Sequence, residues 1–179
     1  MSTGGNRVVE DARVQGPDPV SVGEMWRREL PGVDVTNIVL ASAVHRVAQL
    51  LEQDFTELAR EHDLLPSELR VLFALRRSPG ETLSPTQLFR QLMITSGAVS
   101  KQVARLCERH LVSRRLDPDV PRGVLVQLEP AGRDIAEQAV RRMSLRHAGL
   151  EDLDRGTAKS AITALREVLA ALDTSLSTD

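Results

Sequence analysis

The 179-residue chain has few aromatic residues, one cysteine and no long apolar run. Aromatic residues make up 2% of the sequence, so leucine, valine, alanine and isoleucine must form the core, which favours a mainly helical protein. The single cysteine, Cys107, excludes an intrachain disulfide and fits a reducing compartment. No stretch approaches the about 18 apolar residues of a membrane span, and the N-terminus lacks the apolar core of a secretory signal. We therefore expect a cytoplasmic protein without a membrane partner.

Lysine is also scarce, because arginine supplies 21 of the 23 basic residues. The net charge is only −2, but its distribution is uneven. Residues 84–133 contain eight basic and four acidic side chains, whereas residues 34–65 contain six acidic and two basic ones. Guanidinium groups suit bidentate contacts with phosphate and guanine. The pattern indicates a basic nucleic-acid-binding module on an acidic scaffold.

Turn signals and apolar periodicity divide the chain into four segments. Glycine and proline without an apolar pattern predict a disordered arm at the N-terminus. Apolar residues at helical spacing predict helices on both sides of a central module, and these helices can build an interlocked dimer. The segments are a disordered arm at 1–20, N-terminal helices for dimerisation and a pocket wall at 21–65, a winged helix-turn-helix DNA-binding domain at 66–130, and C-terminal dimerisation helices at 131–179.

Start and stop signals predict the flanking helices. Ser21 is expected to cap a short helix that carries the only tryptophan, Trp26, as a packing anchor or as a pocket wall. A long helix is expected to begin at Asp34 or Thr36 and to end near Glu61. The remaining helices are expected from Pro130 to about His147 and from Asp154 or Thr157 to about Leu172.

Two capped helices follow each other in the central module. Ser84 and Pro85 mark the first, and Thr95 or Ser96 caps the second. In the second helix Val99, Val103 and Leu106 share one face, and the opposite face is small, polar and basic: Ser96, Gly97, Ser100, Lys101 and Ala104. Such a face suits insertion into a major groove about 12 Å wide. An ordinary solvated face is the alternative, and the preceding capped helix at helix-turn-helix spacing favours DNA reading.

Two β-branched runs, 111–116 and 123–128, predict a hairpin directly after the second helix. Asp117 and Asp119 are expected to pair with Arg122 or Arg115 and to fix the shape of the proline-containing loop. Arg122 at the tip would then enter a narrow minor groove, where negative potential attracts arginine. Of Arg114 and Arg115, which alternate across the strand, one is expected to meet phosphate and the other a carboxylate.

Catalytic motifs are missing from the sequence. It contains no glycine-rich phosphate loop, no metal-ligand spacing and no nucleophile elbow, and its four histidines are scattered. We expect neither an enzyme nor a cofactor. A winged-helix module that binds another protein is the remaining alternative to a DNA-binding protein, and the Ser/Lys face and Arg122 argue against it.

The stretches TSGAVSKQVARL, HLVSRR, DPDVPRG and LEPAGR, in this order, resemble the MarR family of transcriptional regulators over about residues 34–172. The resemblance implies a homodimeric, ligand-responsive repressor on a pseudopalindromic operator. Glu129 departs from the Ser or Thr that usually caps the following helix, and Val120-Pro121 makes the wing stiffer and less basic. The expected DNA-binding residues are Thr95, Ser96, Gly97, Ser100, Lys101, Arg105, Arg115, Asp117, Asp119 and Arg122.

The N-terminal extension with Trp26 resembles the urate-responsive branch of that family. The branch's Asp and Arg positions hold Arg70 and Gln102 here, so a carboxylate or phenolic effector is expected in place of urate. The expected ligand-binding residues are Trp26, His45 and Arg70. Peroxide-sensing relatives carry their reactive cysteine near the first long helix, whereas Cys107 lies on the recognition helix and is expected to be inert. Redox regulation through Cys107 is the alternative.

Overall fold

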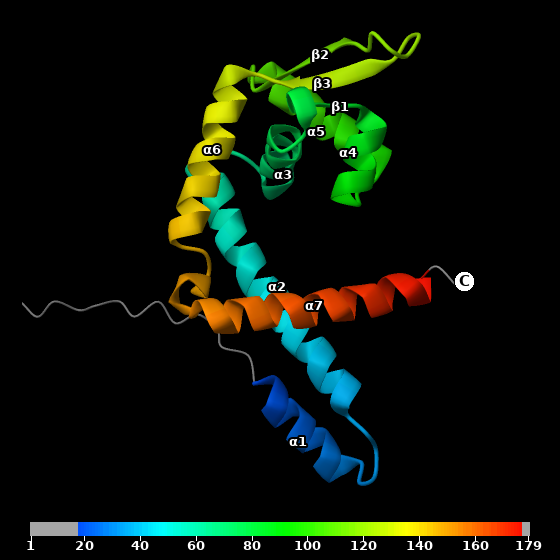
Figure 1. The fold of residues 1–179 in the computed structure, drawn as a ribbon, viewed down its shortest axis with the longest axis vertical. Coiled ribbons are helices and arrows are strands. Elements are labelled where there is room, and N and C mark those ends of the chain that lie inside the picture. The colour runs from blue at the N-terminus through cyan, green and yellow to red at the C-terminus, as the bar shows by residue number, and fades with distance from the viewer. Residues whose placement is uncertain (1–17, 177–179) are drawn as a thin grey trace, which may run out of the picture. The chain divides into compact units, whose positions relative to one another are not determined.

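A computed structural model describes residues 18–176 (Figure 1). The mainly helical fold with a small β-wing is confirmed. Contacts divide the chain into two compact units, one up to Leu50 and one from Leu51 onward. Within the described range, no helix has the length and apolarity that crossing a membrane requires. The elements are α1 (Pro19–Glu29), α2 (Thr36–Glu61), α3 (Pro66–Arg76), η1 (Pro79–Glu81), β1 (Thr82–Leu83), α4 (Pro85–Leu92), α5 (Ser96–Glu108), β2 (Val112–Leu116), β3 (Val124–Leu128), α6 (Pro130–Leu145), η2 (Leu150–Asp152) and α7 (Arg155–Leu176).

The first unit contains α1 and the N-terminal part of α2. The cap of α1 is Asp18, not Ser21 as predicted: the Asp18 carboxylate accepts the Ser21 N–H at 3.0 Å, and Pro19 occupies the first helical position. Of the arm predicted at 1–20, residues 1–17 lie outside the described residues, and 18–20 belong to the start of α1. Gly23 is buried, and the position requires glycine because a β-carbon there would lie 2.3 Å from Val39 of α2.

The helix-turn-helix is formed by α4 and α5, as the capping signals predicted. Ser84 and Gln87 form a reciprocal capping box at the start of α4. Met93 then adopts a left-handed conformation with φ 51°, which ends α4 and redirects the chain into α5. Four apolar residues of the two helices face the core of the second unit, where they join buried residues of α3: Leu88, Val99, Val103 and Leu106.

The sheet has three antiparallel strands in the order β1-β3-β2. The predicted hairpin is present, and its register pairs Val112 with Leu128 and Leu116 with Val124. The two-residue strand β1, which was not predicted, pairs with β3 on its other side. Gly123 is required where the hairpin closes, because a β-carbon there would lie 2.8 Å from Asp117 and Val120.

An ion-pair cluster within the second unit joins the C-terminal part of α2 to α6. Arg142 donates to both carboxylate oxygens of Asp54 at 3.1 and 2.9 Å, and His147 Nδ1 lies 2.6 Å from Asp54 Oδ2. Burial alone would raise the pKa of Asp54, but the hydrogen bonds from His147 and Arg142 outweigh it, and the pKa lies below its usual value. The carboxylate is therefore more stable in the folded protein than in the unfolded chain.

Helix ends after the sheet differ from the prediction by a few residues. α6 ends at Leu145 instead of His147, and α7 extends to Leu176 instead of Leu172. Glu129 makes no side-chain cap for α6, as its departure from Ser or Thr suggested. The choice between Asp154 and Thr157 is settled for Asp154, whose carboxylate accepts the Gly156 and Thr157 N–H groups.

Gly132 offers a test of packing between α6 and the chain that enters β2. A β-carbon at Gly132 would lie 2.2 Å from the carbonyl oxygen of Leu111. Because this oxygen belongs to the backbone, it cannot easily move away. We expect Gly132→Ala to lower the free energy of unfolding by about 1–3 kcal/mol, measured by urea denaturation. Gly97→Ala is the matched control: nothing lies within 4 Å of that position, so removing a helical glycine should raise stability by up to about 1 kcal/mol. Equal effects of both substitutions would contradict this packing.

The Asp54 cluster offers a test by pH. Because the folded-state pKa of Asp54 is lowered, its contribution to stability is present above the unfolded pKa and is lost as the pH falls through the folded one. We expect Asp54→Asn to be less stable than wild type above about pH 5, with the difference shrinking toward about pH 2. Glu57→Gln, an exposed carboxylate on the same helix, serves as the control and should show no such trend. A wild-type advantage over Asp54→Asn that persists undiminished at pH 2 would contradict the assignment.

Candidate DNA-binding surface

Helix α5 presents the predicted small, polar face to solvent. The Thr95 hydroxyl accepts the Ala98 N–H at 3.3 Å and caps the helix, so the choice between Thr95 and Ser96 falls on Thr95. Four residues of the predicted groove face are exposed, and the opposite face is buried. The exposed residues are Ser96, Gly97, Ser100 and Lys101.

A buried carboxylate fixes α5 to α3. Glu68 is 3% exposed, and it is the only buried charged residue in the described part of the chain. One of its oxygens accepts the Leu65 N–H at 2.8 Å and caps α3, and the other lies 3.1 Å from Arg105 Nε on α5. Arg105 was predicted to contact DNA. The structure instead pairs its guanidinium with Glu68.

A second arginine anchors the C-terminal end of α5. Arg109 donates to the carbonyl oxygens of Asp63 at 2.5 Å and His62 at 3.2 Å. These carbonyls belong to the turn that follows α2, so they lack partners within that helix. Together with the Glu68–Arg105 pair, this contact ties α5 to the corner between α2 and α3.

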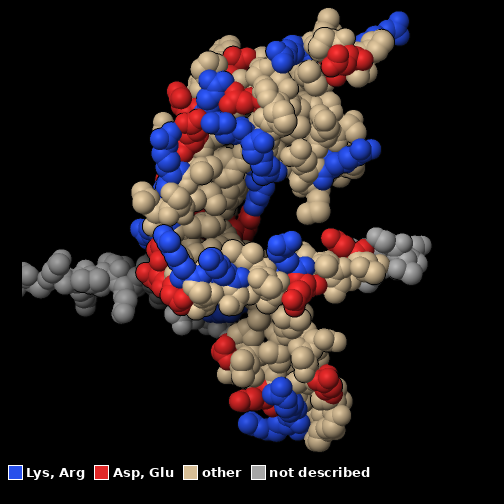
Figure 2. All heavy atoms as spheres, viewed as in Figure 1, with Lys and Arg blue, Asp and Glu red and all other residues tan. Residues whose placement is uncertain are grey.

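The structure sorts the basic residues of 84–133 into two groups. Arg105, Arg109 and Arg133 are engaged internally, Arg133 by the carboxylate of Glu81. The other five form no ion pair with any described residue, so their charges are available to an external anion. These five are Arg90 on α4, Lys101 on α5, Arg114 and Arg115 on β2, and Arg122 in the wing loop, residues 117–123 between β2 and β3. Figure 2 shows Lys and Arg side chains at the outer end of the hairpin and on α4.

The wing loop is held by hydrogen bonds among its own residues. Asp117 Oδ1 accepts the Asp119 N–H at 2.9 Å, and the Asp117 N–H donates to the Gly123 carbonyl at 2.9 Å. The predicted ion pairs of Asp117 or Asp119 with Arg122 or Arg115 are wrong within residues 18–176, because hydrogen bonds inside the turn already fix its shape. The predicted carboxylate partner for Arg114 or Arg115 is likewise not found in this range. Arg122 has a left-handed backbone, φ 60°, at the tip.

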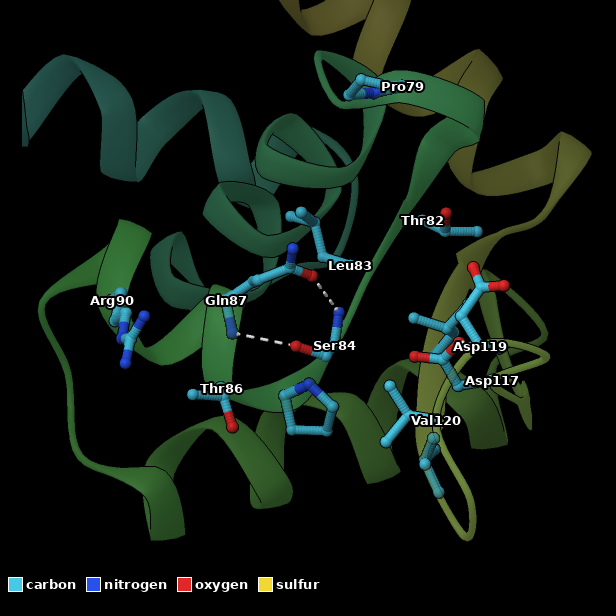
Figure 3. A pocket seen from close by; sticks show the side chains of 14 residues that line it. Pro79, Thr82, Leu83, Ser84, Thr86, Gln87, Arg90, Asp117, Asp119 and Val120 are labelled. Carbon is cyan, nitrogen blue, oxygen red and sulfur yellow. Dashed lines mark hydrogen bonds between the residues drawn. The ribbon is translucent and has the colours of Figure 1, made fainter.

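Concave surfaces surround α4 and reveal residues that sequence reasoning missed. An open concavity of about 750 Å³ separates the start of α4 from the wing, with Arg90 on one side and Asp117 and Asp119 on the other (Figure 3). A smaller one of about 240 Å³ brings Arg114 next to Ser100 of α5. The register explains this position of Arg114, since it pairs with the buried Val126 and so faces the helices. Strand alternation alone could not say which arginine faces inward.

The predicted effector residues belong to different units. Trp26 and His45 are in the first unit, where Trp26 is 44% exposed, and Arg70 is in the second. Arg70 forms an ion pair with Glu52, and its guanidinium carbon lies 4.6 Å from the centroid of the Phe55 ring. Gln102 holds the position at which the urate-responsive branch has an arginine. Its side chain is half-buried, and its Oε1 has no hydrogen-bond partner in the described structure.

Cys107 is half-buried on α5. Burial raises the pKa of its thiol, and the charge of Arg114 opposes this only in part. A raised pKa leaves less thiolate, the form that reacts with oxidants, which supports the expectation of an inert thiol. Within the described residues, no three His, Cys, Asp or Glu side chains are grouped so that they could hold a metal ion.

The sequence comparisons identify the class of protein. The profile of the MarR family matches residues 62–123, which include α3, α4, α5 and β2. The Escherichia coli multiple antibiotic resistance protein MarR is 30% identical over 101 residues, covering 56% of this chain and 69% of the relative. The HTH-type transcriptional regulator PecS of Dickeya dadantii is 26% identical over 110 residues, covering 61% of this chain and 66% of PecS. The chain thus spans about two thirds of the length of these relatives. It belongs to the MarR family, whose members are transcriptional regulators and not enzymes.

Solved structures agree on the fold. A mutant of E. coli MarR complexed with operator DNA has a TM-score of 0.64 at 23% identity, covering 81% of this chain and 98% of that chain. Bordetella bronchiseptica BpsR, whose DNA binding is regulated by 6-hydroxynicotinic acid, has a TM-score of 0.59 at 23% identity. The likeness covers 72% of this chain and 91% of BpsR. At this identity the likeness establishes the winged-helix fold.

Proposed function

We propose that the chain is a homodimeric repressor that binds a pseudopalindromic operator. Helix α5 enters the major groove with Ser96, Ser100 and Lys101, and Arg122 of the wing enters the adjacent minor groove. The observation that carries the proposal is the group of five basic side chains without ion-pair partners among the described residues, all on α4, α5, β2 and the wing loop. The operator complex of the similar E. coli MarR supports the same use of this fold.

A dimer is supported by the apolar side of α7. Ile162, Leu165 and Leu169 are 59%, 44% and 58% exposed and recur at helical spacing. A 22-residue helix without a buried side chain among its residues 155–174 gains little from its own chain, so its stability requires a covering surface. We assign that surface to the second copy, which would supply the second recognition helix for a two-fold operator.

The wing can be tested by the salt dependence of binding. Removing one contact with a phosphate reduces the slope of log affinity against log salt by about 0.9, so removing the wing contact from both protomers of a dimer should reduce it by about two. We therefore expect Arg122→Ala to weaken binding to all sequences and to make the slope shallower by about two. Fluorescence anisotropy with duplexes selected from a random library by the wild-type protein gives the measurement.

Arg133→Ala is the matched control for this experiment. It removes the same charge, from α6 instead of the wing loop, and the guanidinium of Arg133 is already engaged by Glu81. Its salt slope should equal that of wild type. A wild-type slope in Arg122→Ala would contradict the wing contact, and a change of about one would indicate that a single wing is bound.

We also propose a small anionic effector, an aromatic carboxylic acid or phenol, that binds at Arg70. The Arg70 guanidinium already contacts both a carboxylate, that of Glu52, and the Phe55 ring, two kinds of contact that an aromatic acid could offer. The regulation of BpsR by 6-hydroxynicotinic acid supports this class of effector for a protein of this fold. Binding would displace Glu52 from Arg70 and shift the dimer to a state with lower operator affinity.

Calorimetry with salicylate tests the effector proposal. Arg70→Ala should abolish binding. Glu52→Gln should tighten binding about two- to fivefold, because the ligand then no longer has to displace the exposed Arg70–Glu52 ion pair, which contributes up to about 1 kcal/mol. Arg60→Ala, which removes an exposed charge elsewhere on α2, is the control and should leave the affinity unchanged. Unchanged affinity in Arg70→Ala would overturn the assignment.

A further inference from the structure

One aromatic side chain lies on the side of the helix-turn-helix that carries the polar face of α5. Phe89 of α4 is 42% exposed, whereas its helix neighbour Leu88 is fully buried. The chain has only three phenylalanines, and the other two, Phe55 and Phe73, pack edge to face with their ring centroids 5.8 Å apart. Phe89 is thus the one phenylalanine that is not used in the core.

Phe89 shares a surface with the proposed base-reading residues. A concavity of about 350 Å³ is lined by Pro85, Thr86 and Phe89 of α4 and by Ser96 and Ser100 of α5. None of the five carries a charge, and the basic residues Arg90 and Lys101 follow Phe89 and Ser100 directly in sequence. The apolar groups of Pro85 and Phe89 therefore lie beside the three hydroxyl-bearing side chains of this concavity, with cations available on both helices.

The chemistry of DNA limits what such a wall can contact. Phosphates and most atoms on the base edges form hydrogen bonds, which a phenyl ring cannot satisfy. The apolar group that the major groove offers is the C5-methyl group of thymine. Contact with a methyl group requires no particular hydrogen-bond geometry, so its contribution follows from the apolar area removed from water.

From this concavity we infer that Phe89 is a specificity-determining residue, which selects thymine next to the bases faced by Ser96 and Ser100. The inference rests on the proposed operator binding and names a contact within it. A serine hydroxyl can donate to or accept from several bases, so the two serines discriminate weakly by themselves. The ring adds a preference that the polar groups of α5 cannot supply.

Uracil substitution tests this contact, because uracil lacks only the C5-methyl group. The full chain first selects duplexes from a random library, and each thymine of the selected half-site is then replaced in turn by deoxyuridine. At one position per half-site the wild-type protein should bind about fourfold more weakly, the value expected for one buried methyl group. Phe89→Ala should bind the thymine and uracil duplexes equally at that position, and Phe89→Leu should retain part of the preference.

Arg90→Ala is the matched control on the neighbouring residue. It should weaken binding to all duplexes by the same factor, because it removes a cation. The weaker binding caused by uracil should remain, because the ring is still present. Thermal unfolding of Phe89→Ala should match wild type closely, since the ring is half-exposed. The inference is overturned if Phe89→Ala keeps the wild-type penalty or if no thymine position matters to wild type. Failure of the wild-type protein to bind any duplex at low salt overturns the operator proposal as well.

Discussion

The orientation of the recognition helix depends on one buried carboxylate. Glu68 is stable in the core because the Leu65 N–H donates a hydrogen bond to one of its oxygens and the Arg105 guanidinium forms an ion pair with the other. Since those partners lie at the start of α3 and on α5, satisfying the charge fixes the two helices against each other. Arg109 adds a second tie at the far end of α5. The exposed Ser96–Lys101 face is therefore presented from a helix that cannot easily rotate.

Arginine has two roles in this chain. With few aromatic residues to fill a core, the helices of the second unit are also joined by guanidinium–carboxylate pairs: Arg76 reaches Glu137 on α6, and Arg142 reaches Asp54 on α2. These arginines are neutralised and contribute little to an external field. The basic residues of α4, α5, β2 and the wing loop lack such partners within the described range, and we propose that their positive potential favours DNA.

Local signals predicted much of the fold and part of the interface. The caps at Ser84 and Thr95, the apolar stripe of α5 and the hairpin depend on residues within a few positions of each other, and the structure contains all of them. Strand β1 was missed because two residues carry no periodicity. At α1, both Asp18 and Ser21 could cap a helix, and the proline at position 19 favoured the earlier one. Phe89 carried no local signal, since exposure of an apolar residue depends on what packs around it.

The sequence by itself determined the order of the main helices and the hairpin, the family, and the helix that carries the small polar face. Only the tertiary structure decided which charges remain for a partner. Arg109 and His62 are 47 positions apart, and Arg142 and Asp54 are 88 apart, so no local pattern could show that these guanidiniums are already engaged. Charge counts treat all arginines alike. Folding distinguishes them, because a buried carboxylate or an unpartnered carbonyl must find a donor wherever the chain brings one.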